Sequence, residues 1–142
     1  MQFAQIIEFI GNHWELVLAL IVILLILGYD IVAGNRNSID PLEAVSVINH
    51  DNALVIDVRS IEEFVNGHVI HSLNIPLNLV LKQLSTLEKH KERPIIMICN
   101  SGARSAQACR QLLGNGFAKV YNLRGGILAW ENAGLPITRK NH

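Results

Sequence analysis

The sequence predicts an α/β domain whose mostly parallel β-sheet is covered by helices on both faces, preceded by one transmembrane helix. From residue 39 onward, short apolar runs typical of buried strands alternate with helical patterns. Strands that alternate with helices form parallel sheets with both faces covered. Residues 16–28 form an uninterrupted apolar run without charge. The 142 residues include only two cysteines, Cys99 and Cys109, so a reducing compartment is expected rather than a disulfide framework.

The apolar run is long enough, with its flanks, to cross a bilayer. Its uncharged core between Glu15 and Asp30 has 14 residues, which corresponds to about 21 Å of helix. Extension from Trp14 to Ala33 gives 20 residues, and Trp14 and Tyr29 then lie near the two interfaces, where amphipathic rings are favoured. We therefore predict a membrane-anchor helix over residues 1–34, a polar linker over residues 35–38 and a globular domain over residues 39–142.

Two alternatives to an anchor remain open. A cleaved signal peptide normally has a basic amino-terminal region; residues 1–35 contain no Lys or Arg, although residues 31–34 resemble a cleavage site. A buried core helix would belong to the folding unit, whereas this run lies outside it.

The orientation of the anchor is predicted from the charges beside it. The first positive charge is Arg36, directly after the span. The positive-inside rule then predicts a single-pass membrane protein whose carboxyl-terminal domain faces the cytoplasm.

Turn and capping signals delimit the elements of the domain in chain order. Asp40 precedes a helix that begins with Pro41. Ser60 and Glu63 form a capping box for a short helix, and Gly114 ends a later helix. We expect strands over residues 53–56, 72–75, 95–98 and 120–123. We expect the later helices over residues 77–84, 105–113 and 127–132.

The stretch ICNSGARSA, residues 98–106, combines a thiol, small residues and an arginine. It follows the most apolar predicted strand, and ligands of parallel sheets bind beyond the carboxyl ends of the strands. A thiolate is the nucleophilic form of cysteine, and the amino terminus of the next helix, with Arg104, favours negative charge. The small side chains let backbone N–H groups turn inward as an anion nest. The candidate site therefore comprises Cys99 as nucleophile and Asn100, Ser101, Gly102, Ala103 and Arg104 as anion-binding residues.

Asp57, Arg59 and Cys109 lie outside the cysteine loop, and each has a structural interpretation. Asp57 and Arg59 follow a central strand, where they either line the pocket or support neighbouring loops and Glu63 through hydrogen bonds. We favour the supporting role, because buried charges are normally paired. Cys109 lies within a helix without an arranged partner, and we predict that it is structural. A buried, unreactive thiol is the commoner role of a free cysteine and is also the structural alternative for Cys99.

Several short motifs accompany the cysteine loop. They are CNSGAR at residues 99–104, Asp57-Val58-Arg59, Glu63-Phe64, Gly67-His68-Val69, Asn74-Ile75-Pro76, and Gly125-Gly126-Ile127 followed by Ala129-Trp130. In this order and spacing they resemble the rhodanese family of single-domain, thiosulfate sulfurtransferase-like proteins. The resemblance covers residues 38–138, and the apolar segment before it resembles the membrane-anchored members of that family.

The resemblance implies a five-stranded parallel sheet with helices on both sides. It also implies that Cys99 takes a sulfane sulfur from a donor, holds it as a persulfide, and passes it to cyanide or a thiol. The N–H groups of residues 100–104 would stabilise the sulfur, and Arg104 would bind the anionic end of the donor. The family chemistry needs no metal or organic cofactor. One departure is Ile70-His71-Ser72, where the family usually has Pro-Gly-Ala. The resemblance therefore does not predict the conformation of this loop.

Two other functions compete with sulfur transfer. Cysteine phosphatases surround phosphate with a Cys-x5-Arg loop, whereas Cys99 and Arg104 have Cys-x4-Arg spacing, which suits a sulfur atom better than a tetrahedral phosphate. A membrane-tethered module that binds a membrane-protein partner would need no turnover, since fold does not fix function. The expected partners are a small anionic sulfur donor, a thiol or cyanide acceptor and the membrane. The chain has no basic stripe with interleaved aromatic residues, so a nucleic acid is not expected.

Overall fold

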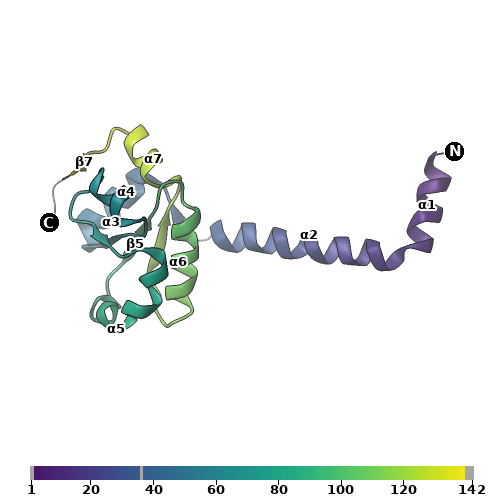
Figure 1. The fold of residues 1–142 in the computed structure, drawn as a ribbon, viewed down its shortest axis with the longest axis horizontal. Coiled ribbons are helices and arrows are strands. Elements are labelled where there is room, and N and C mark those ends of the chain that lie inside the picture. Colours follow the sequence, from purple (N-terminus) through teal and green to yellow (C-terminus); the bar gives the residue numbers. More distant parts are fainter. Residues whose placement is uncertain (1, 36, 140–142) are drawn as a thin grey trace. The chain divides into compact units, whose positions relative to one another are not determined.

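The computed structural model describes residues 2–35 and 37–139 (Figure 1). The chain divides into two compact units, residues 1–36 and 37–142. The predicted linker overlaps both units, because Asn35 is the last residue of a helix and Ser38 belongs to a strand. Arg36, which carries the predicted orientation, lies outside the described residues.

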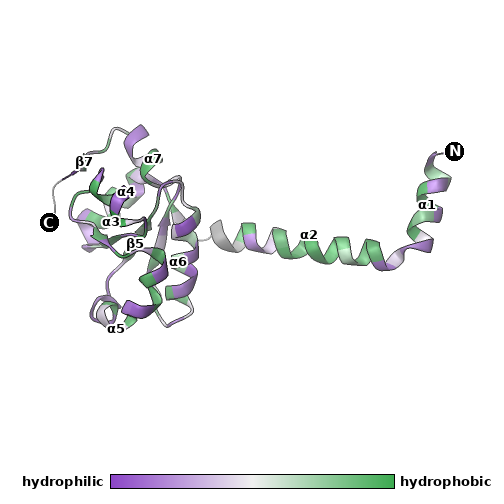
Figure 2. Ribbon diagram, in the orientation of Figure 1, coloured by the Kyte–Doolittle hydropathy of each residue, from purple (hydrophilic) through white to green (hydrophobic). Residues whose placement is uncertain are grey.

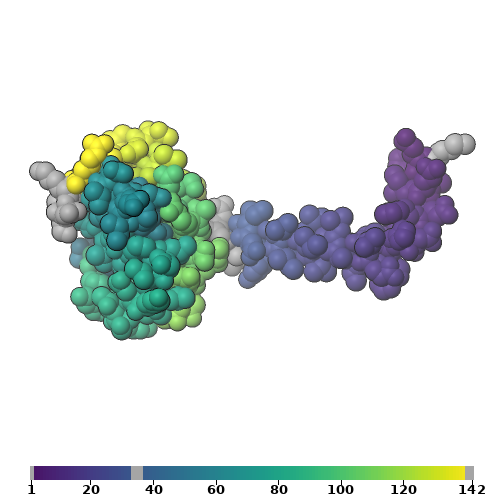
Figure 3. All heavy atoms as spheres, in the orientation of Figure 1, coloured from purple at the N-terminus to yellow at the C-terminus, as the bar shows by residue number. Residues whose placement is uncertain are grey.

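The amino-terminal unit consists of two helices instead of the one predicted. Helix α1 spans Gln2–Asn12 and α2 spans Trp14–Asn35, with His13 between them. Within α2, Trp14–Val32 is 19 residues long with a mean hydropathy of 2.6, and is long and apolar enough to cross a membrane (Figure 2). Its side chains lie at the surface (Figure 3). Signal sequences and core helices also reach this length and hydropathy, so α2 is a candidate span.

The second unit is built on a five-stranded parallel sheet in the order β1-β6-β5-β2-β4. The strands are β1 Ser38–Ile39, β2 Leu54–Asp57, β4 Leu73–Asn74, β5 Ile95–Ile98 and β6 Val120–Leu123. A separate antiparallel pair joins β3 His68–Val69 to β7 Ile137–Thr138. The predicted fold class is therefore confirmed, with β5 at the centre of the sheet and its carboxyl end leading into the cysteine loop.

Helices cover both faces of this sheet because its central strand is apolar on both sides. Ile95, Met97 and Cys99 pack into one core cluster with residues of α6. Ile96 and Ile98 pack into a second cluster with residues of α3 and α7. The helices are α3 Pro41–Asp51, α4 Ile61–Val65, α5 Leu84–Leu87, α6 Ala103–Leu113 and α7 Gly126–Asn132.

The helix predicted over residues 77–84 is instead a series of short turns. Three 3₁₀ turns, η1 Leu77–Leu79, η2 Leu81–Gln83 and η3 Glu88–His90, flank the single α-helical turn of α5. Backbone bonds such as Val80 N–H to Leu77 C=O span three residues instead of four. A 3₁₀ turn has about three residues per turn, so Leu81 faces solvent while Val80 and Leu87 are buried. The apolar spacing alone did not distinguish these two helix types.

The segment that departs from the family pattern forms a tight turn. Ser72 donates from its N–H to Val69 C=O at 3.1 Å and from its hydroxyl to the same oxygen at 2.6 Å. His71 has a φ of 64°, a left-handed conformation that glycine adopts most easily. The turn therefore forms without the family's usual Pro-Gly pair, and it leads into β4.

Candidate active site

Cys99 lies at the carboxyl end of β5, directly after Ile98, and is buried. Asn100 and Ser101 form an exposed loop, and Gly102 turns the chain into α6 with a φ of 103°. Helix α6 begins at Ala103, two residues before the predicted start, so Ala103 belongs to the first helical turn rather than to the loop. The sulfur consequently lies beneath the amino-terminal end of an 11-residue helix.

Hydrogen-bond donors converge on the Cys99 sulfur. The Gly102 N–H donates to Sγ at 3.0 Å, and the Ser105 hydroxyl lies 3.2 Å from it. Burial alone would raise the pKa of Cys99, but hydrogen bonds from the Ser105 side chain and the backbone N–H groups of Ser105, Gly102 and Ser101 lower it. The hydrogen-bond donors that favour the thiolate are therefore the Ser105 hydroxyl and the backbone N–H groups of Ser101, Gly102 and Ser105.

A buried amide fixes the position of Ser105. Asn122 on β6 donates from Nδ2 to Gly102 C=O at 3.1 Å, which directs its Oδ1 toward the Ser105 hydroxyl, 2.5 Å away. A serine hydroxyl has a single proton. Two acceptors, Asn122 Oδ1 and Cys99 Sγ, therefore compete for this one proton.

Helix α7 holds the carbonyl side of the cysteine loop. Ile127 donates its N–H to Cys99 C=O at 2.8 Å, and Leu128 donates to Asn100 C=O at 3.4 Å. Because the carbonyl groups point toward α7, the opposite edge of the backbone presents its N–H groups to the sulfur. Gly126, with a φ of 63°, permits this approach, since a Cβ there would collide with Cys99 C=O and Asn100 C=O.

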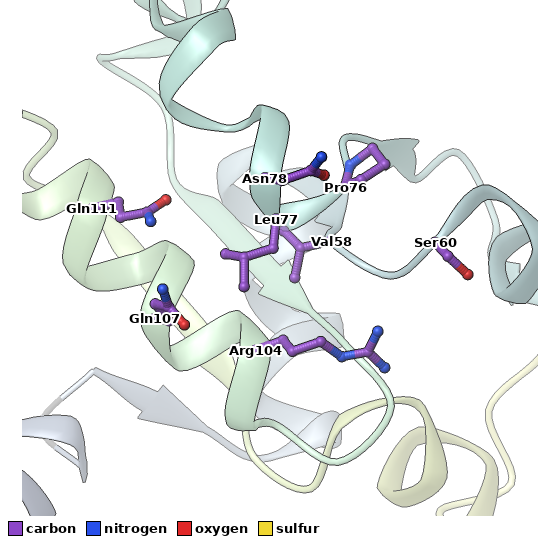
Figure 4. A pocket seen from close by; sticks show the side chains of 8 residues that line it. All are labelled: Val58, Ser60, Pro76, Leu77, Asn78, Arg104, Gln107 and Gln111. Carbon is purple, nitrogen blue, oxygen red and sulfur yellow. The ribbon is translucent and has the colours of Figure 1, made fainter.

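Arg104 extends from the first turn of α6 and forms an ion pair with Glu63 of α4. Its Nη2 lies 3.0 Å from Oε2 of Glu63 and its Nη1 lies 3.4 Å from Oε1. This hydrogen bonding raises the pKa of Arg104. Arg104 also lines a pocket of about 450 Å³ whose wall includes Val58 and Leu77. Figure 4 shows its guanidinium pointing toward the side of the pocket where Ser60 lies.

Asp57 and Arg59 form a buried pair at the end of β2, beside β5. Arg59 Nη2 donates to Asp57 Oδ2 at 2.7 Å and also to Gly67 C=O at 2.7 Å. The side chains are 1% and 6% exposed. This arrangement corresponds to the supporting role predicted for the two residues, except that Glu63 contacts Arg104.

Three residues of this site were not singled out from the sequence. The sequence predicts Ser105 only as the first residue of a helix, and it predicts Glu63 as a hydrogen-bond partner of Asp57 and Arg59. Asn122 carried a usable signal, because it is a buried polar residue in an otherwise apolar strand and such groups require hydrogen-bond partners. The pairs Ser105–Asn122 and Arg104–Glu63 could not be predicted from sequence, because they depend on where the side chains point in the folded chain.

Replacement of Ser105 by alanine is expected to raise the pKa of Cys99, because the Ser105 side chain makes the largest contribution that lowers it. Loss of a hydrogen bond to a charged group reduces the thiolate fraction at neutral pH by roughly tenfold. The ultraviolet absorbance of the thiolate, titrated against pH with Cys99→Ser as baseline, measures this change. Ser101→Ala is the matched control, since Ser101 acts through its backbone N–H. Superimposable titrations of Ser105→Ala and the unsubstituted protein would contradict the assignment.

The comparison with known proteins identifies the family. Residues 40–133 match the rhodanese-like domain family. The chain is 32% identical to the uncharacterised protein YibN of Escherichia coli strain K12, over 95% of this chain and 97% of YibN. It is 40% identical to a protein named sulfurtransferase from Allochromatium vinosum, over 61% of this chain and 79% of that protein.

Solved structures agree with this assignment. The crystal structure of a rhodanese-related protein from Thermoplasma volcanium superposes with a TM-score of 0.67 and 28% identity. The match covers 74% of this chain and 100% of that one. Because the family match spans most of the chain, including β5, the cysteine loop and α7, the protein belongs to the rhodanese-like family.

Proposed function

We propose that this protein is a sulfurtransferase that moves a sulfane sulfur through a persulfide on Cys99. In the first step the Cys99 thiolate attacks the outer sulfur of a donor such as thiosulfate. An S–S bond forms on Cys99, and sulfite leaves with the electron pair of the broken bond. In the second step cyanide or a thiolate attacks the outer sulfur of the persulfide and regenerates the Cys99 thiolate. Splitting one transfer into two covalent steps is the general advantage of nucleophilic catalysis.

The observation that carries this proposal is the set of donors around the Cys99 sulfur. Gly102 N–H and the Ser105 hydroxyl lie within hydrogen-bond distance of Sγ, and together with the other loop N–H groups they lower the pKa of the thiol. A thiolate at neutral pH is the nucleophile that sulfur transfer requires. The name of the 40% identical relative from Allochromatium vinosum, sulfurtransferase, supports the same chemistry.

The other site residues have proposed roles that follow from their positions. The N–H groups of residues 100–104 stabilise the thiolate and the outer sulfur of the persulfide. Arg104, at the rim of the pocket, binds the anionic end of the donor. Asp57 and Arg59 support the end of β2 beside the loop.

The proposal is tested by intact mass spectrometry of the full chain in detergent micelles after incubation with thiosulfate. The expected result is a gain of one sulfur atom, lost again on addition of cyanide with formation of thiocyanate. Cys99→Ser should show neither, whereas Cys109→Ser, which removes the other thiol, should behave as the unsubstituted protein. Absence of the added sulfur would overturn the proposal and leave a binding module. Phosphate release that depends on Cys99 would favour the phosphatase.

We also propose that α2 anchors the protein as a single transmembrane span, with the rhodanese-like domain in the cytoplasm. The length and hydropathy of Trp14–Val32 support the span, and the positive-inside rule supports the orientation. The protein should remain with membranes after an alkaline carbonate wash, and protease should reach the domain only from the cytoplasmic side. Recovery of the domain in the soluble fraction would contradict the anchor.

A further inference from the structure

The positive charge of Arg104 is engaged by a carboxylate in this structure. Both terminal nitrogens of its guanidinium face the two oxygens of Glu63, at 3.0 and 3.4 Å. Arrangements of this kind are geometrically specific as well as charge-assisted. The two side chains are 40% and 42% exposed, so an incoming anion competes directly with Glu63 for Arg104.

Within the described residues 37–139, the two arginines that follow β2 and the cysteine loop are each paired with a carboxylate. Arg59 is neutralised by Asp57 at 2.7 Å, and Arg104 is neutralised by Glu63. The two ion pairs carry no net charge. When Cys99 is a thiolate, the site formed by these two pairs and Cys99 therefore has a net charge of −1. A free dianion must therefore approach Cys99 and Glu63 against their repulsion, and its attraction to Arg104 is reduced by the Glu63 carboxylate.

We propose that Glu63 determines which sulfur donors the site accepts, by screening Arg104 so that a monoanion carrying an organic group is favoured over a free dianion. The inference rests on the proposed function of Cys99. The pocket beside Arg104 measures about 450 Å³, and Val58, Pro76 and Leu77 give it apolar walls. These walls can contact the organic group of such a donor. Thiosulfate has no organic group and gains nothing from them.

The transfer from such a donor is balanced without any further reactant. With an organic thiosulfonate, the Cys99 thiolate attacks the terminal sulfur and forms the new S–S bond. The bond between that sulfur and the sulfonyl sulfur breaks, and the organic sulfinate leaves with the electron pair. One anion is exchanged for another, so no proton, oxidant or reductant is needed.

The test compares a dianionic and a monoanionic donor in the full chain in detergent micelles. The donors are thiosulfate and benzenethiosulfonate, the acceptor is cyanide, and thiocyanate formation gives kcat/KM for each. Removing one charge at roughly 6 Å in a water-like dielectric changes binding about threefold per unit of donor charge. Glu63→Gln should therefore raise kcat/KM about tenfold for thiosulfate and about threefold for benzenethiosulfonate. The ratio between the donors should shift threefold toward thiosulfate, chiefly through KM, and less so at high salt.

Glu62→Gln is the matched control, because it removes the same charge from the same helix and leaves the Arg104 contact in place. Its donor ratio should stay close to that of the unsubstituted protein. Glu63→Ala serves as a second charge-removing variant in case Glu63→Gln folds poorly. A donor ratio that is unchanged in the Glu63 variants, or changed equally by Glu62→Gln, would overturn the inference, even if both donors react more slowly. In that case sulfur uptake on Cys99 would still support the proposed function. No uptake from either donor would overturn both.

Discussion

Replacement of Asp57 by alanine is expected to lower the free energy of unfolding by about 3–5 kcal/mol, because it leaves a buried guanidinium without its counter-ion. Arg59 is 6% exposed at its side chain and its Nη2 donates to both Asp57 and Gly67 C=O. Without Asp57, the guanidinium retains only the carbonyl, which cannot neutralise its charge. Urea unfolding of the full chain in detergent, followed by circular dichroism, measures the loss.

An exposed ion pair in the same domain is the control for this prediction. Lys91 and Glu88 lie 3.3 Å apart with their side chains 32% and 55% exposed. Glu88→Ala should therefore cost roughly 0.5 kcal/mol or less. Equal losses for Asp57→Ala and Glu88→Ala would show that the Asp57–Arg59 pair does not stabilise the end of β2.

The second large effect is expected from Gly126→Ala. The added Cβ would collide with Cys99 C=O and lie 2.5 Å from Asn100 C=O, at a residue whose φ is +63°. The left-handed conformation alone costs about 1–2 kcal/mol, and the displaced backbone should bring the total loss of stability to about 3 kcal/mol. Because the loop positions the Cys99 sulfur, the rate of sulfur uptake should fall on the order of 100-fold.

Gly134→Ala separates the backbone conformation from the collision. Gly134 has a similar φ of +76°, but no atom lies within 4 Å of its missing Cβ. This variant should lose only about 1–2 kcal/mol and keep its rate of sulfur uptake. If both glycine variants behaved alike in urea unfolding and in sulfur uptake, contact between α7 and the cysteine loop would not position the nucleophile.

The central part of the fold could be predicted from sequence because its signals are local and strong. Residues 95–98 are four consecutive apolar residues, and they form β5, which is buried on both faces. Gly114 marks the end of α6, and Ser60 accepts from Glu63 N–H at the start of α4. The position of Cys99 at the end of β5 followed directly from these elements.

The remaining features depend on contacts between distant segments. Strand β1 has two residues and exists because it pairs with β6, more than 80 residues later, so it has no periodicity of its own. The partner of Arg104 is Glu63, 41 residues earlier, and the support of Ser105 comes from Asn122 on β6. Such pairings are set by tertiary packing rather than by local pattern.

The protonation state of Cys109 has a consequence for the proposed persulfide mechanism. Burial raises the pKa of Cys109 to about 12, so at neutral pH it is a protonated thiol although it shares a core cluster with Cys99. A protonated thiol is a poor nucleophile, and it would not resolve a Cys99 persulfide into an internal disulfide. In that mechanism the sulfur would remain on Cys99 until an external acceptor arrives, and the two proposed half-reactions could be separated in time by the supply of that second substrate.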